Sequence, residues 1–204
     1  MPSDPLRVLI FGAHPDDADF SAGGVAALYS RRGDVVKMVH RPNDYHPDHR
    51  YASQLVQDAS YLLTVPNVVS HVPHLRIMPT IVYTWDNFQK PYPFQADVVV
   101  AIDEVIEQKL DALHCHTSQV YEWLPYNGRY LDQVPATPDE RRAWLGQQRS
   151  YRFRQAADLY RDKLVAVYGE ERGRAVQHAE AFEACEYGTP LSDENRSRLF
   201  PFFD

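Results

Sequence analysis

Twice near its start, the chain places a short apolar run before a polar turn and an amphipathic helix, and this alternation limits the folds open to it. Residues 8–11 are a continuous apolar run closed by Gly12, which is typical of a strand buried on both faces in a parallel sheet. Residues 19–32 carry apolar side chains at helical spacing. Residues 35–39 and 50–63 repeat the pattern of buried strand and helix. Strands that alternate with helices favour an α/β fold with a parallel sheet and helices on both faces.

The rest of the chain continues the alternation. Two further strands and two further helices are predicted, at residues 80–85, 97–101, 103–119 and 140–168. Residues 125–139 are polar and contain prolines, so a loop is expected there. The periodicity of residues 177–187 favours neither helix nor strand. Because there are no internal repeats and no break in composition, residues 1–204 are interpreted as one domain.

The composition is that of a folded globular protein: 44% of the 204 residues are hydrophobic and 24% are charged. A net charge of −7 argues against a nucleic-acid partner. Cys115 and Cys185 are far apart, which indicates neither a disulfide scaffold nor a cysteine zinc site and favours a cytoplasmic location. The first apolar run is too short for a signal peptide, and no stretch approaches the ~20 residues that span a bilayer.

Two polar clusters directly follow the first two predicted strands. They are residues 13–17, Ala-His-Pro-Asp-Asp, and residues 46–49, His-Pro-Asp-His. Ligands of open α/β sheets bind beyond the carboxyl ends of the strands, where both clusters are expected. Imidazole and carboxylate donors suit a catalytic zinc ion, which takes three protein ligands and one water. Zinc lowers the pKa of that water to about 7, a carboxylate can take its proton, and an imidazole can stabilise the oxyanion.

Each cluster also has an ordinary structural interpretation. A His-Pro-Asp sequence after a strand is often only a turn, Asp17 or Asp19 could cap the following helix, and His49 could be a simple first-turn residue. The coincidence of two such clusters, both at strand-to-helix turns, favours a metal site. A dinucleotide-binding enzyme is disfavoured, because residues 12–17 lack the required glycine pattern and their two carboxylates would repel phosphate.

In combination, residues 12–17 (Gly-Ala-His-Pro-Asp-Asp), the pair Gly23 and Gly24, and residues 46–49 resemble the signatures of the PIG-L/LmbE-like zinc-dependent de-N-acetylases. The resemblance continues later in the chain, at residues 116–119, 122–124, 179–183 and 186–188. It implies an α/β fold with a Rossmann-like parallel sheet. The implied reaction is hydrolysis of the acetamide of a small-molecule N-acetylated amino sugar, which gives acetate and a free amine.

The resemblance also implies how the Zn²⁺ would be held. His14 and Asp17 match the first two zinc ligands of the family, and His49 matches the third. Asp16 matches the general base that takes a proton from the metal-activated water. Adjacent carboxylates in a turn point in different directions, so Asp16 and Asp17 need not share one task.

Three further residues acquire roles from the resemblance. His46 matches the imidazole that stabilises the tetrahedral oxyanion and can protonate the leaving amine, and Asp48 is its expected orienting partner. His116, at the end of the helix predicted from residue 103, is expected to shape the substrate end of the site. A histidine at a helix end is equally explained by the helix dipole.

The chain departs from the family in an apparent internal deletion. Relatives carry a long stretch between the first helix and the second motif, whereas here residues 32–40 lead almost directly into it. The Rossmann-like sheet is therefore expected to be shortened by missing strands, and the right-handed crossover rule leaves the mutual geometry of the two motifs open. An inactive relative that only binds metal or sugar is the alternative. A sheet edge exposed by the deletion would favour a homo-oligomer.

Overall fold

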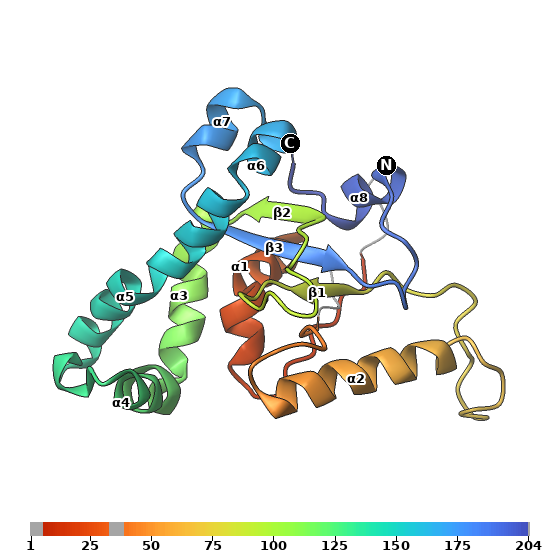
Figure 1. Ribbon diagram of the computed structural model, residues 1–204, viewed down its shortest axis with the longest axis horizontal. Helices are drawn as coiled ribbons and strands as arrows, with labels where there is room; N and C mark the ends of the chain where they lie inside the picture. The colour runs from red at the N-terminus through yellow and green to blue at the C-terminus, as the bar shows by residue number, and fades with distance from the viewer. Residues whose placement is uncertain (1–5, 33–38, 204) are drawn as a thin grey trace. The chain divides into compact units, whose positions relative to one another are not determined.

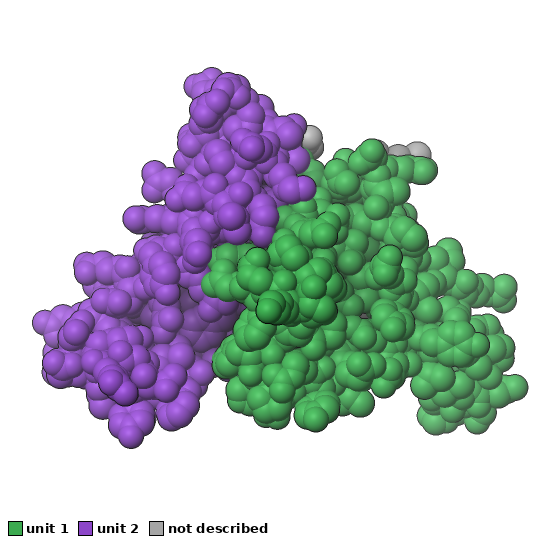
Figure 2. All heavy atoms as spheres, viewed as in Figure 1, with its two compact units in different colours: residues 1–13, 33–98, 181–204 green, residues 14–32, 99–180 purple. Residues whose placement is uncertain are grey.

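The computed structural model describes residues 6–32 and 39–203, and the chain divides into two compact units (Figure 2). Unit 1 comprises residues 1–13, 33–98 and 181–204, and unit 2 comprises residues 14–32 and 99–180. Among the described residues, no helix combines the length and the apolar character needed to cross a bilayer. The interpretation of residues 1–204 as one domain stays a prediction.

Unit 2 is built mainly of helices (Figure 1). Its α-helices are α1 (Asp17–Arg32), α3 (Ile106–Cys115), α4 (Leu124–Gly128), α5 (Pro138–Leu159), α6 (Arg161–Tyr168) and α7 (Glu170–Ala175). Helix α1 has acidic residues in its first turn and arginines in its last, which complements the helix dipole. Thr137 caps α5 by accepting a hydrogen bond from the Glu140 amide. A buried apolar cluster forms the core, with members Leu110, Leu113, Val120, Tyr121, Leu145 and Phe153.

Two predicted helices of unit 2 are shorter than the sequence suggested. The helix expected over residues 103–119 begins as a short 3-10 turn (Asp103–Val105) and ends at Cys115, because His116 leaves the helical conformation at φ −84° and ψ 59°. The helix expected over residues 140–168 is interrupted at Tyr160. The predicted loop at residues 125–139 contains most of α4 and a 3-10 turn (Leu131–Gln133).

A buried ion pair holds α1 within unit 2. The Lys109 ammonium lies 2.5 Å from a Glu180 carboxylate oxygen and donates to the Phe20 carbonyl oxygen at 2.9 Å. The same carboxylate accepts from the amides of Gly24 and Val25, at 2.9 and 2.8 Å. In an undisturbed helix the Gly24 amide donates to the Phe20 carbonyl oxygen. Here Lys109 bonds that carbonyl and Glu180 bonds that amide. Complete burial lowers the pKa of Lys109, and Glu180 opposes that shift.

Unit 1 contains α2 (Pro47–Leu62), α8 (Asp193–Leu199) and β1 (Val82–Thr84). Helix α2 begins with a proline in its first turn after the N-cap residue His46. A small core joins Val39, Ile81, Tyr83 and Cys185, with Val56 of α2 packed against it.

The three strands form one sheet in the order β1-β3-β2, with β2 at Val98–Ala101 and β3 at Ala179–Ala184. Strand β3 pairs with β1 in antiparallel register, with Val82 opposite Ala184 and Thr84 opposite Phe182. Next to β2, the amides of Asp97 and Ile102 donate to the carbonyls of Phe182 and His178, which is again an antiparallel order. The strands predicted at residues 80–85 and 97–101 are therefore confirmed in position.

The sheet differs from the predicted Rossmann-like parallel sheet. Strand β3, which the sequence left unassigned, lies between β1 and β2 and runs antiparallel to both. Residues 8–11 form no strand, only a single bridge at Ile10. Of the strand predicted at residues 35–39, only Val39 belongs to the described residues, and it bridges Tyr83 in parallel. The structure thus confirms a mixture of helices and strands and corrects the orientation of the described sheet.

Candidate metal centre

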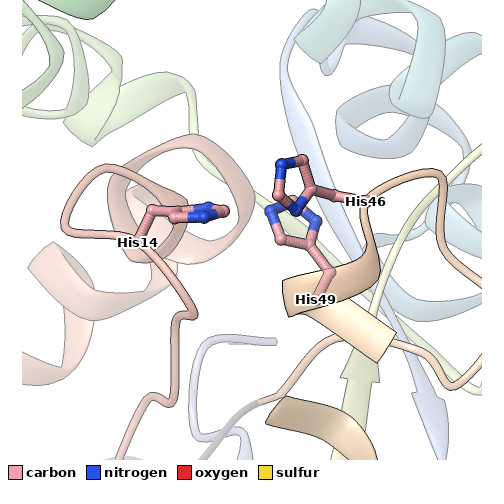
Figure 3. A group of neighbouring side chains, drawn as sticks. All are labelled: His14, His46 and His49. Atoms are coloured by element: carbon pink, nitrogen blue, oxygen red, sulfur yellow. The ribbon is translucent and has the colours of Figure 1, made fainter. Parts of the chain in front are cut away.

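The first motif lies on the turn that leads into α1, in unit 2. The Asp17 carboxylate accepts a hydrogen bond from the His14 amide at 2.7 Å and lies 3.5 Å from Nδ1 of the His14 ring (Figure 3 draws this ring). Asp16 and Asp17 are buried, and the Asp16 carbonyl accepts from the Phe20 amide. The N-terminal end of a helix carries positive partial charge, which stabilises both carboxylates. The turn therefore holds one imidazole and one carboxylate beside each other.

His116 lies against the same first turn of α1. Its Nε2 is 2.7 Å from a carboxylate oxygen of Asp19, two residues beyond Asp17. The structure therefore links the C-terminal end of α3 to the end of α1 that carries the motif. The expected contact of His116 with substrate stays a prediction.

The second motif begins α2, in unit 1. His46 is the N-cap residue, and its Nδ1 accepts a hydrogen bond from the Asp48 amide at 3.2 Å. A ring nitrogen that accepts is unprotonated in the neutral imidazole, so the proton is assigned to Nε2. The Asp48 carboxylate lies further from the same Nδ1, at 3.8 Å, and is exposed. The Asp48 amide therefore contacts the His46 ring directly, and the orienting role expected of the Asp48 side chain stays a prediction.

Asp44 is the central residue of this cluster, and the sequence analysis did not single it out. One of its carboxylate oxygens lies 3.0 Å from His49 Nδ1 and accepts from the His46 amide at 3.1 Å. Burial raises the pKa of Asp44, but these two hydrogen bonds and the charges of His49 and His40 outweigh it and hold the pKa below 3.8. A histidine that donates Nδ1–H to a carboxylate presents Nε2 as a metal donor, the usual arrangement of zinc-bound histidines. The signal in the sequence that could have identified Asp44 is its position five residues before His49, a predicted metal ligand.

Three imidazoles gather around Asp44. The rings of His40 and His49 are stacked with centroids 4.0 Å apart, and the centroids of His46 and His49 are 5.1 Å apart. In each of these two pairs, a ring nitrogen of one histidine lies within 4.8 Å of a ring nitrogen of the other histidine. Figure 3 shows His46 on the loop that leads into α2 and His49 in the first turn of the helix. Unit 1 thus offers several nitrogen donors in one place.

A buried arginine fixes the segment that carries His40. The guanidinium of Arg41 is fully buried, lies 3.0 Å from Asp86 and 3.2 Å from Glu183, and donates to the Tyr92 carbonyl at 3.1 Å. Burial raises the pKa of both acids, and the positive charge of Arg41 opposes the shift. This network ties the imidazole cluster to β3 and to the loop that follows β1.

The structure therefore groups the predicted site residues into two sets. His14, Asp16, Asp17 and His116 belong to unit 2, and His46, Asp48 and His49 belong to unit 1. Each set combines imidazole with carboxylate, the donor types that zinc accepts from proteins. A single ion shared by both sets stays a prediction.

No protein-family model matches the chain, and no curated protein matches it by sequence. The fold is similar to that of GalB, the 4-carboxy-2-hydroxymuconate hydratase from Pseudomonas putida KT2440, with a TM-score of 0.53 and 16% identity over 90% of this chain and 65% of that one. The conserved protein TT1542 from Thermus thermophilus gives a TM-score of 0.48 and 18% identity over 87% of this chain and 65% of that one. The chain thus spans 65% of the length of each solved structure, and its likeness to GalB concerns the fold alone.

Proposed function

We propose that this chain is a zinc-dependent hydrolase that removes the acetyl group from an N-acetylated amino sugar. The observation that carries the proposal is the Asp44–His49 pair, in which a buried carboxylate at 3.0 Å holds the ring so that Nε2 is presented as a donor. The resemblance of the two motifs to those of the PIG-L/LmbE-like de-N-acetylases agrees with it. The proposal includes a single domain with a Rossmann-like core, which the parallel bridge between Val39 and Tyr83 supports.

The donor sets fit zinc chemically. His14 and Asp17 would hold the ion from the turn before α1, and His49 would hold it from the first turn of α2. The metal supplies a Lewis-acidic centre that lowers the pKa of a water molecule to about 7. Two imidazoles and one carboxylate are a common ligand set of catalytic zinc sites.

The remaining residues of the motifs would handle protons and charge. Asp16 takes a proton from the attacking water, whose oxygen forms a bond to the acyl carbon. The Nε2–H of His46 donates to the oxyanion that develops on the carbonyl oxygen, and the Asp48 amide keeps the ring in this tautomer. The C–N bond then breaks, the proton passes from Asp16 to the leaving nitrogen, and acetate and a free amine result.

Zinc content tests whether the two sets share one ion. We expect one zinc per wild-type chain, and we expect His14→Ala and His49→Ala each to weaken binding strongly, because each removes one of three ligands. His71→Ala is the matched control, since His71 is an exposed histidine outside both sets. Full zinc binding by His14→Ala would place the ion on unit 1 alone and contradict the shared site.

Amine release from N-acetylglucosamine tests the reaction. Asp16→Asn should keep the zinc and lose activity by about 10²-fold or more, because the general base is removed. Near-normal turnover in this variant would refute the role of Asp16. Zinc binding by folded wild-type protein without turnover of any N-acetylated sugar would favour the alternative of a binding module.

A further inference from the structure

An apolar pocket of about 350 Å³ lies within unit 1, between one face of α2 and the segments that precede the two motifs. Helix α2 contributes Ala52, Leu55, Val56 and Ala59 to its wall, and the C-cap residue Leu63 follows them. Ala52, Val56, Ala59 and Leu63 follow one another at intervals of three and four, and Leu55 stands next to Val56, so they form a single stripe along the helix. Within residues 6–32 and 39–203, which the structure describes, none of the residues that line the pocket is charged.

Among the described residues of the wall, Ser60 alone carries a hydroxyl, and that hydroxyl is already engaged. Ser60 donates to the Gln57 carbonyl oxygen, within the helix. The described wall of the pocket therefore offers an occupant apolar contact. A volume of this size lies at the lower end of the range of small-molecule sites.

The pocket adjoins the imidazole cluster of unit 1 along the chain. His49 lies on the same side of α2 as Ala52 and Val56, which follow it by three and seven residues. Among the other lining residues, Val39 directly precedes His40, and Gly12 stands two residues before His14. From the level of Ala52 to that of Leu63 the stripe extends about 16 Å along the helix axis. The pocket thus runs away from the imidazole cluster in one direction.

We propose that this pocket binds the acyl chain of an N-acylated amine whose acyl group is longer than acetyl. The inference rests on the proposed hydrolysis of an N-acylated amine and replaces the acetyl group of that proposal with a longer acyl group. A methyl group fills only a small part of the available volume, whereas an extended alkyl chain matches both the apolar wall and its length. The acyl chain is favoured over an alkyl group elsewhere on the substrate because it is bonded directly to the reacting carbon, and the pocket adjoins the proposed ligand His49 on α2.

Binding should therefore strengthen with acyl length. Each methylene that is fully buried tightens binding by about fourfold. We expect N-octanoylglucosamine to bind far more tightly than N-acetylglucosamine. Octyl N-acetylglucosaminide, which carries its chain on the opposite side of the sugar, should bind as weakly as N-acetylglucosamine. Isothermal titration calorimetry on the zinc-loaded protein measures all three.

A variant that fills the pocket provides the matched test. Ala59→Trp places a large side chain at the exposed rim of α2, where it does not disturb the core. It should weaken binding of the octanoyl amide at least tenfold and leave N-acetylglucosamine unchanged. Gln54→Trp puts the same side chain on an exposed position of α2 outside the pocket and should change neither. Circular dichroism and thermal melting verify that both variants fold.

The outcomes separate this inference from the proposed function. Chain-length-dependent binding that Ala59→Trp abolishes, without release of glucosamine, would support the pocket and refute the hydrolase. Release of amine at rates independent of acyl length, unchanged in Ala59→Trp, would support the hydrolase and overturn the pocket. Tighter binding of octyl N-acetylglucosaminide would mean that the pocket binds an alkyl group on the glycosidic side of the sugar and not the acyl group. That result would also overturn the inference.

Discussion

At the scale of single residues, Asp44 decides which nitrogen of His49 is available. Its carboxylate takes the Nδ1–H of the ring, and its lowered pKa keeps it ionised at neutral pH. We predict that Asp44→Ala weakens zinc binding about 10–100-fold, the usual effect of removing the outer partner of a metal-bound histidine. Competition with a chromogenic chelator measures the affinity. Asp58→Ala, an exposed acid on the same helix, is the control and should bind zinc normally.

The local spacing of residues explains which contacts of the site the sequence predicts. His14 and Asp17 are three residues apart at a helix start, so one turn brings them together, as observed. Lys109 and Glu180 are 71 residues apart, and only the packing of α1, α3 and β3 makes their ion pair. Asp44 is the intermediate case, because its position in an irregular segment does not determine where its side chain points.

At the scale of elements, the longer helices and two of the strands follow from the sequence, whereas the pairing of the strands does not. Strand β3 has the sequence Ala-Glu-Ala-Phe-Glu-Ala, and both of its glutamates are buried. A buried glutamate contradicts the usual rule that charged side chains face solvent. Glu180 is paired with Lys109, and Glu183 with Arg41. Since both partners are distant in sequence, no periodicity could identify this strand, and the antiparallel order of the sheet depends on it.

Helix α1 requires glycine at one position of its glycine pair and merely tolerates it at the other. A Cβ at Gly24 would lie 2.8 Å from the Ile102 side chain, whereas a Cβ at Gly23 would meet nothing closer than 3.4 Å. We predict that Gly24→Ala lowers the free energy of unfolding, because overpacking costs about 1–3 kcal/mol. Gly23→Ala should be neutral or stabilise by up to about 1 kcal/mol through helix propensity. Urea unfolding compares the two, and equal effects would contradict the predicted close packing.

Asp103, in the 3-10 turn that precedes α3, joins this turn to the two residues that precede β3. Its carboxylate accepts hydrogen bonds from the amides of Gln177 and His178 and lies 2.7 Å from the His178 ring. Burial raises the pKa of Asp103, but the His178 side chain, these amides and the His178 charge outweigh it, so the pKa falls below 3.8. A lowered folded-state pKa contributes stability above the ordinary value, and that contribution is lost as pH falls through the folded value.

Asp103→Asn should therefore destabilise the protein most above pH 3.8, with the difference from wild type shrinking at lower pH. Urea unfolding at several pH values measures this difference. The control is Asp162→Asn, which makes the same change of charge at an exposed site. A difference between wild type and Asp103→Asn that stayed constant with pH would mean that the carboxylate charge is not what these hydrogen bonds stabilise.

At the scale of the whole molecule, the proposed ion takes ligands from both compact units, so zinc should stabilise the chain as a whole. A ligand at a hundred times its dissociation constant adds about 2.7 kcal/mol to the free energy of unfolding. For a chain of this size that corresponds to a rise in melting temperature of about 5–10 °C. Calorimetry with zinc, and again after removal of zinc by a chelator, measures the shift.

Variants on either side should then lose the same shift. His14→Ala removes a ligand from unit 2 and His49→Ala removes one from unit 1, so each should abolish most of the zinc-dependent rise. The double variant should lose no more than the worse single variant, because one ion cannot be lost twice. Additive losses would mean that the two units bind separate ions, and a hydrolytic site built from both motifs would then be untenable.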